Sequence, residues 1–151
     1  GQPKIVVDEG IKYPNGMAFT PDQTQLYAAE STSHWIWIFQ VKKDGTLDYK
    51  QRFGRLYAPD TAENAWPDGL KCDTAGRVYV ATRMGIQVLD QVGRVNAILP
   101  VPIGQPSNLC FGGANFDELY VTVQDKVYRR KLKTRGVNTF EPPIKPAKPK
   151  L

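Results

Sequence analysis

The fold of this chain is decided by a stretch of sequence that occurs three times. It reads "YPNGMAFTPDQTQLYAAES" at residues 13–31, "WPDGLKCDTAGRVYVAT" at residues 66–82 and "QPSNLCFGGANFDELYVT" at residues 105–122. Each copy opens with a proline and a small polar residue, continues as a short apolar strand, turns at Asp, Gly or Asn, and ends in a stronger strand. Turns of this composition favour tight antiparallel connections. The three stretches therefore predict three β-hairpins built in the same way.

Further strands extend each hairpin into a unit. The sequence predicts strands at residues 17–19, 26–29, 35–41 and 49–53 in the first unit, at 70–72, 78–81, 86–89 and 95–99 in the second, and at 109–111, 119–123 and 126–133 in the third. An additional strand is expected at residues 4–7. The count is therefore twelve, with a fourth strand absent from the third unit.

Antiparallel units of four strands that recur every 40 to 50 residues indicate a β-propeller, with one unit for each blade. The prediction is an all-β protein. Residues 1–136 form an arc of three blades, at about 13–53, 66–99 and 105–133, and the strand at 4–7 belongs to a neighbouring blade. Residues 137–151 form a Pro/Lys-rich C-terminal tail. A β-sandwich or an irregular all-β domain is the alternative, but it does not explain the repeated openings.

The basic residues are concentrated near the C-terminus. The net charge is +5, yet residues 1–125 carry 11 basic and 14 acidic side chains, whereas residues 126–151 carry nine basic and one acidic. Such a tail is typically solvated, and no stacked-aromatic motif accompanies it, so nucleic-acid binding is disfavoured. No apolar run is long enough to cross a bilayer, and a membrane partner is not expected. The compartment, cytoplasmic or exported, stays open.

Two cysteines, Cys72 and Cys110, are too few for a disulfide framework. Strand alternation places them on opposite sheet faces, and we expect both to be buried thiols. Together with His34 they are also too few for a zinc site. His34 lacks a nucleophile elbow nearby, so a Ser-His-Asp triad is not indicated.

Polar residues occupy the same position in all three units. Because the inner strands of propeller blades begin around one end of a central channel, Asn15, Asp68 and Ser107 are expected to converge there. Oxygen donors of this kind suit a hard divalent cation, Ca²⁺ above all, although Zn²⁺, Mn²⁺ or Mg²⁺ could also use the carboxylate. Taken singly, Asn-Gly and Asp-Gly are ordinary turn dipeptides. The ends of the second strands return to the same mouth and supply further candidate rim residues, namely Glu30, Ser31, His34 and Arg83.

These stretches, with the ending "GVNTFEPPIKPAKPKL" at residues 136–151, make the chain similar to the C-terminal half of the gluconolactonase family, which includes regucalcin and luciferin-regenerating enzyme. The resemblance implies a six-bladed propeller with one divalent metal in its channel and hydrolysis of sugar lactones. It also implies that Asn15 is a metal ligand, and that Asp68 is both a ligand and the catalytic base.

The same resemblance implies an incomplete site, because the family's other ligands and substrate contacts lie in early blades that this sequence lacks. The expected partner is the missing N-terminal half or a second copy of the chain, since twelve and twelve strands make six four-stranded blades. The competing interpretation is a non-catalytic propeller fragment that binds Ca²⁺ or a protein. The lactone itself is not specified by the sequence.

Overall fold

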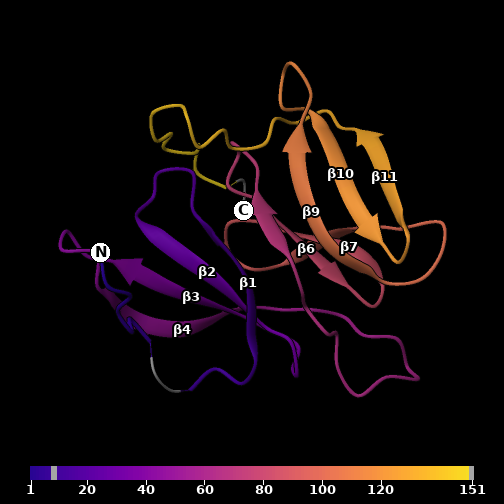
Figure 1. Ribbon diagram of the computed structural model, residues 1–151, viewed down its shortest axis with the longest axis horizontal. Coiled ribbons are helices and arrows are strands. Elements are labelled where there is room, and N and C mark those ends of the chain that lie inside the picture. Colours follow the sequence, from indigo (N-terminus) through magenta and orange to yellow (C-terminus); the bar gives the residue numbers. More distant parts are fainter. Residues whose placement is uncertain (8–9, 150–151) are drawn as a thin grey trace.

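A computed structural model describes residues 1–7 and 10–149 of the chain. In this part of the chain, eleven strands form three antiparallel sheets, and no helix is present, so none could span a membrane. The sheets lie side by side in the order of the sequence (Figure 1). The fold is therefore all-β, as predicted.

The three predicted units correspond to the three sheets. The first consists of β1 (Pro14–Phe19), β2 (Gln25–Glu30), β3 (Trp35–Val41) and β4 (Leu47–Arg55); the second of β5 (Leu70–Cys72), β6 (Val78–Thr82), β7 (Gly85–Leu89) and β8 (Val95–Leu99); the third of β9 (Pro106–Gly112), β10 (Glu118–Val123) and β11 (Lys126–Lys131). Each sheet is a meander in which consecutive strands pair. Eleven of the twelve predicted strands are confirmed.

The segment at residues 4–7 was predicted to be a strand of a neighbouring blade, and this remains a prediction, because the structure holds no other chain with which it could pair. The segment forms no strand, and Ile5 and Val6 are 82% and 56% exposed. A strand needs a neighbour to satisfy its backbone N–H and C=O groups, and no sheet edge takes up this segment.

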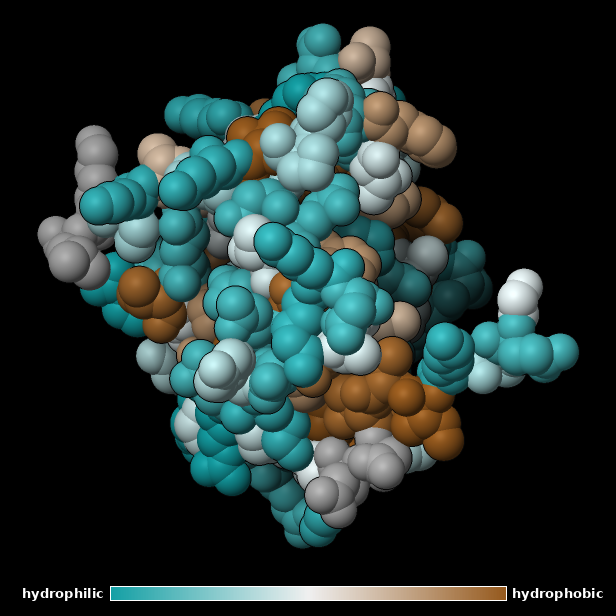
Figure 2. All heavy atoms as spheres, turned by 90° about the vertical axis from the view of Figure 1, so that its left-hand side faces the viewer, coloured by the Kyte–Doolittle hydropathy of each residue, from teal (hydrophilic) through white to brown (hydrophobic). Residues whose placement is uncertain are grey.

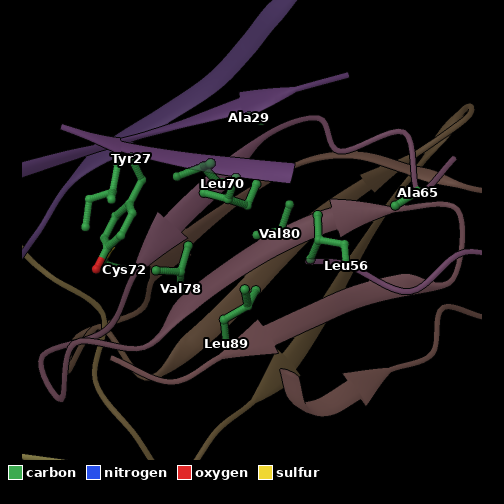
Figure 3. Packing of buried hydrophobic residues seen from close by; sticks show 11 residues of the cluster. Tyr27, Ala29, Leu56, Ala65, Leu70, Cys72, Val78, Val80 and Leu89 are labelled. Carbon is green, nitrogen blue, oxygen red and sulfur yellow. The ribbon is translucent and has the colours of Figure 1, made fainter. Parts of the chain in front are cut away.

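The second sheet is buried on both faces, because its strands alternate between two cores. Val78 and Val80 of β6 pack toward the first sheet, whereas Tyr79 and Ala81 pack toward the third. Figure 3 shows the first of these cores, in which Leu70 and the two valines lie close to residues of the first sheet. This double burial explains the continuous apolar sequence of the strand, since both faces avoid water.

Glycines bring the inner strands of neighbouring sheets into close contact. A Cβ added at Gly16 would lie 2.8 Å from Gly69 Cα and 2.8 Å from Leu70 N, and still closer to the Asp68 carbonyl oxygen. A Cβ at Gly69 would lie 2.8 Å from Asn108 Cα. Each Pro-x-Gly opening therefore lies directly against the backbone of the next unit's opening.

One hairpin turn is tied to the returning chain beyond β11. Asp73 is fully buried and accepts hydrogen bonds from Arg77 Nε at 2.7 Å, Tyr79 Oη at 3.2 Å and Thr134 Oγ1 at 3.0 Å. Asp73 also forms a β-bridge with Gly136. The side chain thus connects the second sheet to a segment that follows the third.

The first and third sheets are each covered on one face only. Met17 and Phe19 of β1 are 65% and 50% exposed, and Figure 2 shows apolar surface among hydrophilic residues on this side of the molecule. On the third sheet, Cys110 is exposed, which corrects the prediction of a buried thiol, whereas Cys72 is buried as predicted. The error follows from the missing neighbour: Cys110 faces away from the second sheet, and no further sheet covers it.

The Pro/Lys-rich segment after Gly136 crosses back over the first two sheets, where Figure 1 shows it in yellow. Ile144 N donates to the Pro21 carbonyl at 2.8 Å, and Gln91 Nε2 donates to the Ala147 carbonyl at 2.7 Å. Most of its residues are exposed, but these bonds fasten the segment to the sheets.

Candidate functional site

The openings of the three units lie next to one another at one end of the sheets. Asn15 stands at the start of β1, Asp68 just before β5, and Ser107 at the start of β9. Gly69 N donates to the Ser107 carbonyl at 3.0 Å, which joins the second opening to the third. The close approach at Gly16 joins the first opening to the second.

The Asn15 side chain is held by a short chain of hydrogen bonds. Its Nδ2 donates to Ser31 Oγ at 3.2 Å, and Ser31 Oγ donates to the Pro67 carbonyl at 2.7 Å. Ser31 is completely buried. The hydroxyl therefore connects the opening of the first unit to the residue that precedes Asp68.

Asp68 is a half-buried carboxylate beside Asn15. Burial raises its pKa above the ordinary value, and this effect outweighs hydrogen bonds from the Asn15 side chain and the Gly69 backbone, which act in the opposite direction. A raised pKa makes the carboxylate a stronger base. Asp68 is thus suited to accept a proton from a neighbouring water molecule.

The donors at this end of the sheets match a hard cation in type but not in number. Asn15 and Asp68 offer an amide and a carboxylate oxygen, whereas Ca²⁺ takes six to eight oxygen ligands. The hydroxyl of Ser107 is exposed and hydrogen-bonds Thr122 Oγ1 at 3.0 Å. In the described part of the chain no three His, Cys, Asp or Glu side chains are grouped to hold a metal. The remaining ligands would have to be water or residues of another polypeptide.

Glu30 is occupied by structural contacts. It is buried, with Oε1 accepting from Lys12 N at 2.7 Å and Oε2 accepting from Trp37 Nε1 at 2.9 Å. Burial alone would raise its pKa, but these donors, together with Ser33, hold the pKa below the ordinary value. The ionised side chain secures the segment that leads into β1.

His34 fastens the long connection between the first two sheets. Its Nδ1 lies 3.0 Å from the Leu56 carbonyl oxygen and its Nε2 lies 3.1 Å from the Glu63 carbonyl oxygen. Arg83 is exposed, and its guanidinium lies 5.3 Å from the centre of the Trp66 ring. Of the four predicted rim residues, Ser31 alone bonds to Asn15.

Two aromatic residues at the openings were not predicted from the sequence. Tyr13 and Trp66 immediately precede Pro14 and Pro67, and both have left-handed backbone conformations, with φ of 56° and 49°. Their ring centroids lie 6.5 Å apart. An aromatic residue before the proline in two of the three repeats was the signal that could have identified them.

The relatives of this chain agree with the resemblance seen in the sequence. Residues 3–125 match the family described as SMP-30/Gluconolactonase/LRE-like region, and the chain belongs to that family. A gluconolactonase of Zymomonas mobilis is 29% identical over 137 residues, which cover 87% of this chain and 38% of that protein. Pentonolactonase XacC of Haloferax volcanii is 31% identical, with 77% of this chain and 40% of that protein covered.

Solved structures share the fold. A gluconolactonase of Xanthomonas campestris superposes with a TM-score of 0.69 at 28% identity, covering 82% of this chain and 39% of that one. A luciferin-regenerating enzyme superposes with a TM-score of 0.72 at 23% identity, covering 84% and 48%, and this likeness concerns the fold alone. The chain spans about two fifths of the length of the curated relatives it matches.

Proposed function

We propose that this chain is the C-terminal half of a metal-dependent sugar-lactone hydrolase, with its three sheets forming three blades of a six-bladed propeller. The observation that carries the proposal is that Asn15 and Asp68 lie at the same end of adjacent inner strands, where Gly16 contacts the backbone of residues 68–70. Membership of a family whose named relatives include gluconolactonase and pentonolactonase supports the substrate class.

In the proposed reaction, Asp68 accepts a proton from the attacking water while the water oxygen bonds to the lactone carbonyl carbon. The ring C–O bond then breaks, and its oxygen leaves as a hydroxyl after receiving the proton that Asp68 had accepted, so that a sugar acid is released. Asn15 and Asp68 would hold a divalent cation, Ca²⁺ first among the candidates, which when bound supplies polarisation of the carbonyl. Ser31 keeps the Asn15 amide in place.

The remaining ligands would come from the missing N-terminal half or from a second copy. Self-pairing would place the uncovered face of the first sheet against that of the third, and it would bring two copies of Asn15 and Asp68 to one channel. The exposed apolar residues Met17, Phe19 and Val127 support such a covering partner.

The test is hydrolysis of δ-gluconolactone by the assembled protein, with its mass checked by light scattering. We expect cation-dependent hydrolysis that chelation abolishes and that Asp68→Asn lowers by about 100-fold or more. Asp44→Asn, which removes a carboxylate from the β3–β4 turn, is the matched control and should retain the activity. Hydrolysis that survives both chelation and Asp68→Asn would contradict the mechanism, as would an assembled protein without activity.

A further inference from the structure

Beside the Asp68 position, an arginine lies against an aromatic ring without an acidic partner. The Arg83 guanidinium lies 5.3 Å from the Trp66 ring centre, within the range of a cation–π contact. Among the residues that the structure describes, no carboxylate lies within ion-pair distance of Arg83. The charge is therefore positioned and available to a ligand.

The backbone fixes how Arg83 is placed relative to Asp68. Asp68 N donates to the Ala81 carbonyl at 2.9 Å, and Arg83 N donates to the Ala65 carbonyl at 3.0 Å. These bonds hold the segment before β5 against the end of β6, with Trp66 two residues before Asp68 and Arg83 two residues after Ala81.

The backbone at the aromatic residues shows that their placement is imposed by the fold. The residue before a proline normally adopts an extended conformation, yet Tyr13 and Trp66 have φ of 56° and 49°. Such conformations persist only where the surroundings enforce them, and they cluster at ligand sites. Trp66 N is held by Asn64 Oδ1 at 3.1 Å, and its ring also meets the Tyr13 ring.

We propose that Trp66 and Arg83 form a subsite for an acidic group on the substrate, located at the end of the sugar remote from the lactone carbonyl. This assignment rests on the proposed function, which puts the carbonyl at Asn15 and Asp68. Trp66 precedes Asp68 in the chain and its ring contacts the Arg83 guanidinium, so the subsite adjoins the position of the carbonyl. The carbon chain packs on the Trp66 ring, and the anion meets the guanidinium, which binds phosphate or carboxylate in a fork.

The test is a titration of the full chain, followed by NMR of the tryptophan indole N–H signals. Two stable ring-opened probes are used, 6-phosphogluconate and gluconate, which differ only at the far end, where the first carries a phosphate and the second a hydroxyl group. We expect 6-phosphogluconate to shift the Trp66 signal and to bind about tenfold more tightly than gluconate, with affinity falling as salt is added. Glucarate, with a carboxylate at the same end, distinguishes phosphate from carboxylate recognition.

Two matched variants test the contribution of Arg83 to binding. Arg83→Gln should weaken 6-phosphogluconate binding about tenfold and remove the preference over gluconate. Arg52→Gln removes a guanidinium that lies 4.7 Å from the Trp35 ring on β3 and should leave binding unchanged. Equal affinity for the two probes, or unchanged affinity in Arg83→Gln, would overturn the subsite.

Asp68→Asn separates this inference from the proposed function, because it removes the base and leaves the subsite. If the wild-type protein hydrolyses no lactone but binds 6-phosphogluconate through Arg83, the subsite is supported and the proposed reaction is wrong. If hydrolysis depends on Asp68 but Arg83→Gln binds 6-phosphogluconate as well as the wild type, the subsite alone is wrong.

Discussion

Asp68 is a side chain whose surroundings oppose its ionised form. Its pKa is raised in the folded chain, so folding is favoured by protonation: this contribution is complete below the unfolded pKa and is lost as the pH rises through the folded pKa. Asp68→Asn, which removes the charge, is therefore expected to raise the melting temperature at pH 7 by an amount equivalent to less than about 1 kcal/mol.

The gain should disappear near pH 3, where Asp68 is protonated in both states. Thermal unfolding followed by circular dichroism at the two pH values measures it. Asp90→Asn provides the contrast, because burial raises the pKa of Asp90 but donors from Arg94 and Asn96 prevail and lower it. That variant should lose stability at pH 7, and a loss of equal size in Asp68→Asn would contradict the account of Asp68.

A substitution at Ser31 tests whether its hydroxyl holds the Asn15 amide in place. Ser31→Ala leaves the Pro67 carbonyl without its 2.7 Å donor and frees Asn15 Nδ2, at a cost of about 1–2 kcal/mol in unfolding free energy. Urea denaturation measures the loss, and calorimetric titration with Ca²⁺ should show weaker binding. Thr32→Ala, at an exposed neighbour, should change neither; a stable Ser31→Ala variant with undiminished binding would exclude the supporting role.

At this scale the sequence predicted that Asn15 and Asp68 lie close together, because their turn dipeptides recur in register, and the adjacent openings confirm this placement. It did not identify the Ser31 bridge or the left-handed Tyr13 and Trp66, because hydrogen bonds between distant residues and backbone strain arise only once the sheets meet. Glu30 illustrates the same limit. Its place at a strand end indicated the rim, but its oxygens are bonded to Lys12 and Trp37.

Among the elements, the inner strands are the most tightly constrained. Gly16→Ala places a methyl group against the backbone of residues 68–70, which cannot rotate away, so we expect a loss of about 2–3 kcal/mol in unfolding free energy. Gly112→Ala is the control, since an added Cβ there meets only the Tyr120 ring at 3.1 Å. Equal losses in chemical denaturation would show that the close approach at Gly16 is unimportant.

The β5–β6 turn is expected to be far more sensitive than the similar β7–β8 turn. Both have the sequence pattern Asp-x-x-Gly-Arg, but Asp73 is fully buried and also accepts Thr134 Oγ1, whereas Asp90 bonds only within its own hairpin. Asp73→Ala should cost about 3–5 kcal/mol, because it leaves Arg77, Tyr79 and Thr134 without their acceptor. Asp90→Ala should cost about 1 kcal/mol in the same urea titration; the reverse order would refute this ranking.

Strand positions were predictable because alternation and turn chemistry are local. The segment at residues 4–7 shows where local reasoning ends, since its apolar sequence favours a strand but pairing depends on an available edge. The prediction that Cys110 is buried was wrong for the same reason, because burial on the far face of β9 requires a neighbouring sheet.

At the scale of the whole molecule, the first and third sheets each have one uncovered face, whereas the second sheet is covered on both faces. If self-pairing completes the propeller, light scattering should give twice the 16.9 kDa mass of the chain, and Phe19→Asp should return it to the single value. Asp44→Asn, on a turn away from these faces, should leave the mass unchanged. A single-chain mass at every concentration would exclude self-pairing and leave the separate N-terminal half as the partner.

The contact of each opening glycine with the next opening has an evolutionary consequence. Because backbone meets backbone there, the offset between Asn15 and Asp68 does not depend on the size of outer-strand side chains. Exposed positions of β4 and β8 can therefore change without moving the two side chains relative to each other. An exposed position such as Arg83 can likewise be substituted while the geometry at the inner strands is kept.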